Sequence, residues 1–592
     1  MKHKTITLFI SLALLLTLLS PLAAAPPLQE GGQDYFIQAD DWLSKLAEKF
    51  YGAPLAYPAI VEATNAKAAE DTSYTVITNP DVIEVGQKLF LPAAAEASSL
   101  LAQSAAPASL SHETVTVALN FSPPSLDPTT GVVSWNTLQL GLGETLARLN
   151  RNGMVEPWLA ESWQQLNDLE WEIKLRPDVT FHDGKPVTAE AVKASLEYSI
   201  EKLPAAASLL KAETISATDP TTIQIKTTEP NPSLGSLLAH YNLVIFDAEL
   251  AKTQPEQFAA KPNMTGPFVA AAFQKDSSLI LTRNPTYWGQ PAQVEQVEVQ
   301  FIVDANTRTN ALLSGQVDMA YQIPPEAVET VQQAGKLVKS ISTGYQYFII
   351  LNVQLPQFAE KEVRQALSQA VDRTAISQQV LLGKAEPATG PISLIFPFAL
   401  KEGYGYDPAQ ANTLLDQAGW VKGEDGIRAK GDQRLAFTLL TYPQRPELAQ
   451  IGVVLQAQLA EVGVAVELRS TDQINDAIKA PDFQAALYAN NTAPTGDPGV
   501  FLNNWYSPKG SSNWVGYDNP EITGLLDQLN LTTDPTRRTE LASEIQQLVL
   551  EDAPHIFLVV PQFNIGLGER LKNYEPFPSD YYIIDNQLQV SQ

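Results

Sequence analysis

The segment from residue 144 to residue 200 constrains the fold of this chain more than any other. Residues 169–175 alternate apolar and charged side chains, which predicts a strand with one buried face and one face in water. A second short strand is expected at 179–181, ended by an Asp-Gly turn. Thr188 then stands at a helix N-cap position. Apolar residues follow at helical spacing: Val192, Leu196 and Ile200. The segment predicts a hairpin followed by an amphipathic helix, with no catalytic group.

The composition bounds the class of protein. A chain of 592 residues is long enough for two or more domains that each bury a core. Its formal net charge of −27 disfavours nucleic acid and anionic membrane surfaces as partners. Because the chain has no cysteine, disulfides, Cys-ligated metals and a lipid-modified N-terminal Cys are all excluded, so the protein is not a lipoprotein.

Short segments spread over residues 113–592 resemble one protein family. They occur in the family's order, which makes the set more specific than any single motif. The segments are VEPWLAESW, LEWEIKLRPDVTFHDGKPVTAEAV, MTGPF, RNPTYWG, DANTRTNALLSGQVDMAY, KEVRQALSQAVDR, YDPAQANTLLDQAGW and TGDPGVFLNNW. Through them the chain resembles the extracytoplasmic solute-binding proteins of peptide and nickel ABC importers, known as family 5.

The resemblance implies an α/β, two-lobed periplasmic-binding-protein-like fold of type II, in the large cluster with an extra subdomain at about 144–262. Lobe one is expected at 113–346 and 559–592, and lobe two at 347–558. The chain would cross between the lobes near residues 346 and 558. Residues 434–469 support this architecture independently, because a strand, a helix and a second strand form a β-α-β unit whose strands should pair in parallel.

Three further parts precede the first lobe. Residues 1–25 have a basic start, an apolar stretch and an Ala-Ala-Ala site, typical of an export signal, and the apolar stretch is nearly long enough for an uncleaved membrane anchor. Residues 34–92 resemble a LysM domain, a small α+β unit, which would either attach the protein to peptidoglycan or serve as a spacer. Residues 93–112 are rich in Ala and Ser, as linkers are. We expect an extracytoplasmic protein, secreted or membrane-anchored.

A two-lobed α/β protein binds its ligand in the crevice between the lobes, beyond the carboxyl ends of strands. By the family resemblance, the loops at 131–136 and 489–498 line this crevice, and tyrosines of lobe one and the hinge are weaker candidates. The candidate ligand-binding residues are Val133, Ser134, Trp135, Asn136, Tyr241, Tyr345, Tyr347, Asn490, Asn491, Thr492, Thr495 and Asp497. Two alternatives stay open, namely that Trp135 is a core aromatic and that Asp497 is a helix cap or turn former.

The loop at 489–498 departs from the family pattern. Peptide binders of the family place a Trp, and then an Asp that pairs with the peptide's α-ammonium, shortly before the GDP segment. Here Asn491 and Pro494 stand near those places. Because a buried ammonium without a carboxylate is costly, the departure weakens peptide binding through a free N-terminus. The ligand is expected to be an oligopeptide or a nickel or other metal chelate of the opine type.

No catalytic constellation can be assigned. The chain has no GxxxxGK[ST] phosphate loop, no HExxH and no G-x-S-x-G. We therefore expect a monomeric binding protein rather than an enzyme, without cofactor or protein-ligated metal, that delivers its ligand to a separate permease and ATPase. Two alternatives remain: a cell-wall-tethered hydrolase, for which no nucleophile or acid/base pair is found, and a chemosensory binding protein.

Overall fold

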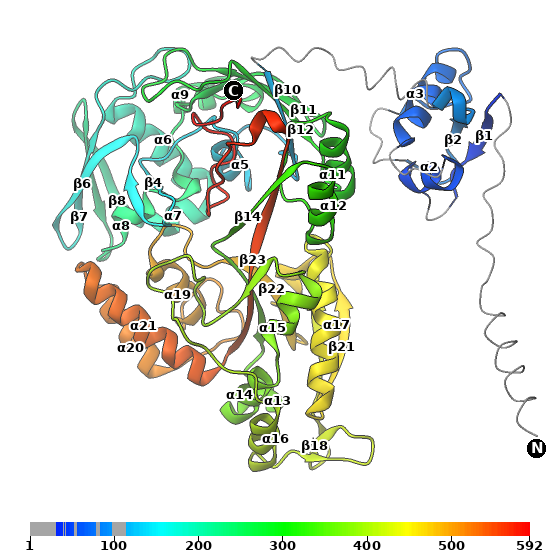
Figure 1. Cartoon of the computed structure of the whole chain (residues 1–592). Coiled ribbons are helices and arrows are strands. Elements are labelled where there is room, and N and C mark those ends of the chain that lie inside the picture. The colour runs from blue at the N-terminus through cyan, green and yellow to red at the C-terminus, as the bar shows by residue number, and fades with distance from the viewer. Residues whose placement is uncertain are drawn as a thin grey trace, which may run out of the picture. The chain divides into compact units, whose positions relative to one another are not determined.

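The computed structural model describes residues 31–38, 41, 43–51, 56–77, 83–97 and 114–591. The expected signal at 1–25 and most of the expected linker lie outside the described residues. The chain divides into two compact units, Met1–Leu110 and Ser111–Gln592 (Figure 1). Within the described ranges, no helix has the length and apolar character needed to cross a membrane.

The N-terminal unit is a small β-α-α-β arrangement. Strand β1 (Gln33–Phe36) pairs antiparallel with β2 (Lys88–Leu91), and α2 (Leu43–Tyr51) and α3 (Tyr57–Ala68) lie between them in the chain. The two helices and β2 enclose a small core of their own. Its buried hydrophobic residues are Ile37, Leu43, Leu46, Ala47, Ala56, Ile60, Ile77, Leu89 and Leu91. The unit is therefore an α+β module with an independent core.

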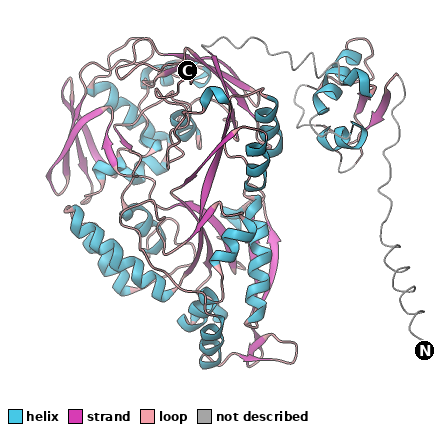
Figure 2. Ribbon diagram, viewed as in Figure 1, coloured by secondary structure: helices cyan, strands magenta, loops and turns pink. Residues whose placement is uncertain are grey.

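The second unit is built on one long mixed sheet (Figure 2). Its strands lie in the order β10 (Phe268–Gln274), β11 (Ser278–Arg283), β12 (Gln296–Phe301), β3 (Thr114–Leu119), β13 (Met319–Ala320), β23 (His555–Leu567), β15 (Tyr345–Leu351), β22 (Ala485–Asn491), β20 (Ala436–Thr441) and β21 (Ala465–Ser470). Two separate hydrophobic cores flank this sheet. One is formed mainly by residues 115–301 and 563–588, and the other by residues 347–559. The two cores define two lobes.

Strand β23 joins the lobes, as the long red strand of Figure 1 shows. Its first half pairs antiparallel with β15 and with β16 (Ala385–Pro387). Its second half pairs antiparallel with β13 and with β14 (Leu337–Ser342). Since β14 and β15 are separated by only two residues, the chain crosses between the cores at this point and again within β23.

The segment 144–200 supplies two strands of a separate four-stranded antiparallel sheet in lobe one. The strand order is β6 (Ala160–Asn167), β7 (Glu170–Leu175), β9 (Thr222–Thr227) and β8 (Ala212–Asp219). The predicted alternation in β7 is confirmed, because Trp171, Ile173 and Leu175 are buried. The predicted cap is also confirmed: Thr188 accepts a hydrogen bond from the Ala191 amide at the start of α6 (Ala189–Lys202). The strand expected at 179–181 is wrong. Only an isolated bridge joins Thr180 to Pro186, because the chain reverses too soon for a ladder.

Lobe two follows the predicted β-α-β pattern. Helix α17 (Pro446–Glu461) connects β20 to β21, and these strands pair in parallel, as expected. Proline also begins α16 (Pro408–Gln417), α19 (Pro498–Tyr506), α20 (Pro520–Leu529) and α21 (Pro535–Asp552), each behind an Asp or Asn cap. Proline suits the first helical position because its fixed φ is helical and its missing N–H needs no partner there.

Candidate functional site

Residues 133–136 were expected to form a loop that lines the crevice. The loop conformation is wrong, because these residues begin helix α5 (Val133–Gln139). Val133 is fully buried, and Leu138 of the same helix belongs to the lobe-one core. The Ser134 hydroxyl donates to the Asn242 side chain at 3.0 Å, and the Asn136 amide donates to Gln139 at 3.0 Å. Val133, Ser134 and Asn136 therefore lie in the interior of lobe one.

Trp135 is the residue of this quartet that stays half-buried. Its ring lies 6.2 Å from that of Tyr241, which in turn meets Tyr581 edge-on at 5.5 Å between centroids. The buried indole Nε1 has no hydrogen-bond partner among the described residues. Because an indole N–H can only donate, this aromatic row presents a donor that the protein itself does not satisfy.

The loop after β22 contains two kinds of side chain. Thr492 is buried, and its hydroxyl contacts the Gly344 carbonyl oxygen beside β15 at 3.1 Å, which fixes the loop. Thr495 is equally buried, but its hydroxyl has no partner within the described chain. Asn490 and Asn491 are half-buried at the end of β22, where Asn491 stands opposite Tyr345 of β15.

Arg445 is the most informative site residue that the sequence analysis missed. It lies between β20 and α17, with its guanidinium 5.3 Å from the centre of the Tyr345 ring. No hydrogen bond or ion pair joins its guanidinium to another described residue, although its backbone contacts Tyr442 and Leu448. Burial works to lower the pKa of Arg445, but Tyr347, Tyr345 and Glu447 outweigh burial and raise the pKa above its usual range. Tyr347 itself is buried and donates a hydrogen bond to Glu447, so it supports the site from inside lobe two.

A signal for Arg445 was present in the sequence. Strands β20 and β22 pair in parallel, so the loops that follow them reach the same edge of the sheet. The loop 489–498 was selected by that rule, and the loop 442–446 satisfies it equally.

Asp580 and Tyr581 were also missed. They belong to the C-terminal segment beyond β23, where described residues have little regular structure and no pattern to read. Both are nearly inaccessible, and neither Asp580 Oδ1 nor the Tyr581 hydroxyl has a partner among the described residues. We call Trp135, Tyr241, Tyr345, Arg445, Asp580 and Tyr581 the interlobe cluster, since both lobes and the hinge strand β15 contribute to it.

Asp497 was expected to contact ligand, but it makes structural contacts instead. Its carboxylate caps α19 through the Gly499 amide at 2.7 Å and pairs with Arg538 of α21 at 2.8 Å. Arg538 also donates to the carbonyls of Leu529 and Thr532, at 2.7 and 2.9 Å. With both carboxylate oxygens occupied, the helix-cap alternative describes Asp497 better than a ligand contact.

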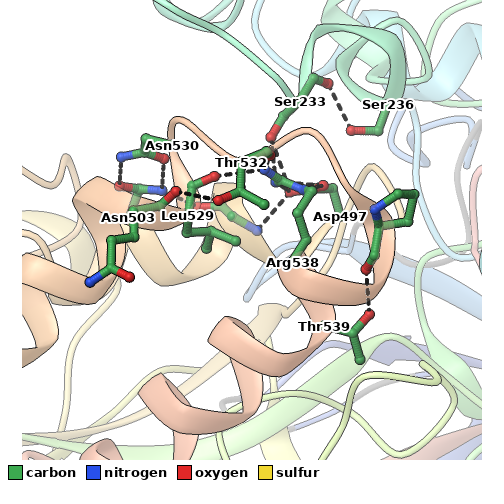
Figure 3. A network of polar contacts seen from close by, with 12 residues as sticks. Ser233, Ser236, Asp497, Asn503, Leu529, Asn530, Thr532, Arg538 and Thr539 are labelled. Carbon is green, nitrogen blue, oxygen red and sulfur yellow. Dashed lines mark hydrogen bonds and ion pairs between the residues drawn. The ribbon is translucent and has the colours of Figure 1, made fainter.

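The Asp497–Arg538 pair also touches the other lobe (Figure 3). Ser233, which precedes α8 (Leu234–Leu237) in lobe one, accepts from Arg538 Nη2 at 2.7 Å and donates to Asp497 Oδ1 at 3.2 Å. Nearby, Gly496 packs so closely on lobe one that an added Cβ would lie 2.6 Å from the Gly153 carbonyl oxygen. The two lobes therefore also make contact away from the strands that cross between them.

Direct metal ligation finds no support in the described residues. They contain no group of three His, Asp or Glu side chains that could hold an ion. Burial lowers the pKa of His182 to about 4 and those of His240 and His555 to about 3, so all three are neutral imidazoles at physiological pH. His240 packs beside the interlobe cluster, with its ring centre 4.2 Å from that of Tyr241, but it belongs to no group of three possible metal ligands among the described residues.

Two open surface cavities lie apart from this cluster. One, of about 500 Å³, is lined by residues 400–404 and the end of α21. The other, of about 300 Å³, is lined by Arg151 and parts of residues 573–589. Neither includes a member of the interlobe cluster.

Comparison with known proteins agrees with this architecture. The family model for bacterial extracellular solute-binding proteins, family 5 Middle, matches residues 154–513, more than half of the chain. The nickel-binding protein NikA of Staphylococcus aureus is 28% identical over 456 residues, which cover 77% of this chain and 90% of NikA. The glutathione-binding protein GsiB of Escherichia coli (strain K12) is 26% identical over 450 residues, which cover 73% and 85%.

Solved structures share the fold. A nickel ABC transporter protein from Bacillus halodurans aligns with a TM-score of 0.69 at 35% identity, covering 81% of this chain and 100% of that one. NikA from S. aureus in complex with Ni(L-His)2 aligns with a TM-score of 0.68 at 27% identity, with the same coverage. Proteins of this group are extracytoplasmic binding components of transporters and not enzymes. The chain belongs to the bacterial extracellular solute-binding proteins, family 5.

Proposed function

We propose that this protein captures a small solute that bears a carboxylate, either a peptide or a metal chelate, between its two lobes and delivers it to the permease of an ABC importer. The observation that carries the ligand class is Arg445, whose guanidinium has no partner in the described protein and lies over the Tyr345 ring. A guanidinium presents donors in a fixed fork that matches a carboxylate and binds it bidentately.

The surroundings of Arg445 suit a small ligand. Trp135, Tyr241 and Tyr345 supply aromatic surface, and a few polar atoms without protein partners stand among them. Sites for small molecules are typically apolar pockets with a small number of placed polar groups. Because Trp135 and Tyr241 belong to lobe one and Arg445 to lobe two, a ligand that contacts all three stabilises lobe closure and shifts the hinge equilibrium.

Two relatives indicate which carboxylates to test. The structure of S. aureus NikA contains Ni(L-His)2, and GsiB is a glutathione-binding protein. Both ligands carry carboxylates, although their amino groups differ, since glutathione has a free ammonium and histidine can use its amine to bind nickel. The lack of a metal-ligand group in the described chain favours an organic chelate over a bare ion if the cargo is a metal.

The test is binding of nickel(II) with L-histidine, and separately of glutathione, to the full chain by calorimetry. Arg445→Gln should weaken the bound probe by at least about tenfold, because hydrogen bonds to charged groups contribute about 1.5–3 kcal/mol. Arg434→Gln is the matched control, since Arg434 is exposed and pairs with Asp425 away from the cluster. Native mass spectrometry of protein purified from rich medium extends the search. Unchanged affinity of Arg445→Gln, or no ligand in either experiment, would contradict the proposal.

We propose further that the N-terminal module at 34–92 binds peptidoglycan and keeps the monomeric protein near its transporter. Its independent core and its exposed Phe36 and Val85, 54% and 71% accessible, support a separate binding function. The expected export segment at 1–25 and the lobe boundaries given above belong to the same proposal. Equal retention on purified peptidoglycan with and without residues 34–92 would overturn the tether, and light scattering tests the monomer.

A further inference from the structure

Asp580 is a buried carboxyl group whose bonding is incomplete. It is 4% exposed, and its Oδ1 atom has no hydrogen-bond partner among the described residues. Its surroundings are the residues of the interlobe cluster. Tyr345 and Arg445 are both close enough to lower the pKa of its carboxyl group, against the larger effect of burial, which raises it. Burial raises the pKa values of the Tyr241, Tyr321 and Tyr581 hydroxyls, and the nearby charge of Asp580 raises them further.

A second buried carboxyl group in the same lobe shows what full bonding looks like. Glu144 is completely inaccessible, yet Tyr287 donates to one of its oxygens at 2.7 Å and Trp288 to the other at 2.9 Å. Burial raises the pKa of both Glu144 and Asp580 to about 7. Burial is the largest cause of both shifts, but only Glu144 accepts hydrogen bonds at both oxygens from described side chains. The structural role that explains Glu144 does not explain Asp580.

The charges around Asp580 point to the missing partner. Arg445 supplies one positive charge near two carboxyl groups, those of Glu447 and Asp580. Glu447 is held by the Tyr347 hydroxyl, and no described Lys or Arg forms an ion pair with Asp580. If a ligand carboxylate takes up the charge of Arg445, the carboxylate of Asp580 is left without a counter-charge. A buried carboxylate in that position is costly unless a cation reaches it.

We propose that Asp580 binds a protonated amine of the ligand while Arg445 binds its carboxylate, so that the ligand is a zwitterion of the amino-acid or peptide type with a free amino group. This inference rests on the proposed function and names the ligand class of the same site. A charge-assisted N–H···O bond would satisfy Oδ1, and each ligand charge would face one of opposite sign. The C-terminal segment thus supplies the carboxylate that the loop 489–498 lacks.

The test compares two peptide pools on the full chain. One is a pool of random tri- to pentapeptides with free N-termini, and the other is the same pool after N-acetylation, which removes the positive charge and keeps the carboxylate. Nickel(II) with L-histidine is a third, separate probe. After rapid desalting, retained masses are counted by mass spectrometry for the natural chain, for Asp580→Asn and for Asp585→Asn. Asp585 is a matched control because it lies in the same segment but lines the cavity beside Arg151.

The natural chain and Asp585→Asn should retain free peptides at least tenfold better than acetylated ones, and Asp580→Asn should reduce this preference to near unity. Retention of free peptides by the natural chain should also fall as pH is lowered from 7.5 to 5, while acetylated peptides stay unaffected. This second measurement needs no variant and so does not depend on Asp580→Asn folding.

Equal retention of both pools by the natural chain, or an unchanged preference in Asp580→Asn, overturns the assignment of Asp580. Retention of the nickel–histidine probe alone also overturns it, but leaves the proposed capture of a carboxylate-bearing solute intact. Retention of none of the three probes overturns the proposed function itself. A thermal denaturation curve for each variant confirms that the comparison is made between folded proteins.

Discussion

Replacement of Ser233 by Ala tests whether the lobes are held together by a specific contact. The Ser233 hydroxyl is the only part of lobe one that hydrogen-bonds to the Asp497–Arg538 pair among the described residues. That pair keeps its own three hydrogen bonds of 2.8 to 3.2 Å within lobe two when the hydroxyl is removed. The substitution therefore affects the contact between lobes and leaves both lobes intact.

The expected effect follows from the number and kind of bonds lost. Hydrogen bonds to charged groups contribute about 1.5–3 kcal/mol each to a buried interaction. Because Ser233 is half-buried, water can replace part of the two lost hydrogen bonds in the variant. Water also solvates Asp497 and Arg538 when the lobes separate. A net loss of about 1.5 kcal/mol lowers the ratio of closed to open molecules by about tenfold, since about 1.4 kcal/mol corresponds to a factor of ten.

The absence of cysteine makes the measurement direct, because a pair of fluorophores can be attached to introduced cysteines alone. Leu166 in lobe one and Val453 in lobe two are suitable positions, being 45% and 58% exposed. Single-molecule energy transfer then gives the closed fraction of the ligand-free protein. Ser236→Ala is the matched control, because the Ser236 hydroxyl donates only to the Ser233 carbonyl within the same lobe, at 2.8 Å. An unchanged closed fraction in Ser233→Ala, or an equal change in Ser236→Ala, would refute the reasoning.

Three further perturbations have defined outcomes. Gly496→Ala should lower the closed fraction more than Gly426→Ala, as measured with the same fluorophore pair. Both glycines have positive φ (+70° and +81°), but only a Cβ at residue 496 would press against Gly153. Thr188→Ala should cost about 1 kcal/mol in urea unfolding through the lost cap of α6. Burial raises the pKa of Asp580 from 3.8 to about 7, so the folded ligand-free protein binds a proton more tightly than the unfolded chain. The free energy of unfolding should therefore fall as pH rises from about 4 to about 7. Denaturation at several pH values should show a smaller fall for Asp580→Asn.

Elements specified by nearby residues could be predicted from the sequence. The alternation in residues 169–175 gave β7, because a strand with one buried face requires that period. Asp407, Asn519 and Asp534 each cap a helix that begins with Pro, and such a pair can be read from the sequence because the cap and the proline act within one turn. These are local hydrogen bonds and local dihedral preferences, which a single sequence displays.

The candidate site depends on contacts that no local pattern encodes. Residues 133–136 looked like loop because Pro and Gly surround them, yet burial of Val133 and the Ser134–Asn242 hydrogen bond stabilise a helix there. Asp580 reaches Tyr345 only because β23 carries the chain back across the sheet from lobe two. Arg445 was identifiable from its place after a parallel strand, but its lack of a partner becomes visible only when the lobes are assembled.

The interlobe cluster and the Ser233 contact act in opposite directions on closure. Trp135 Nε1, Asp580 Oδ1 and the Tyr581 hydroxyl are buried in this structure without hydrogen-bond partners among the described residues, and each such group costs about 1–3 kcal/mol. The Ser233 contact contributes about 1.5 kcal/mol to closure, which offsets the cost of one such group at most. A ligand must favour the closed form by about 5.5 kcal/mol to convert a 1:99 population into 99:1. Under the proposed function, a ligand that satisfies the three groups of the cluster reaches that range, and closure then depends on the ligand.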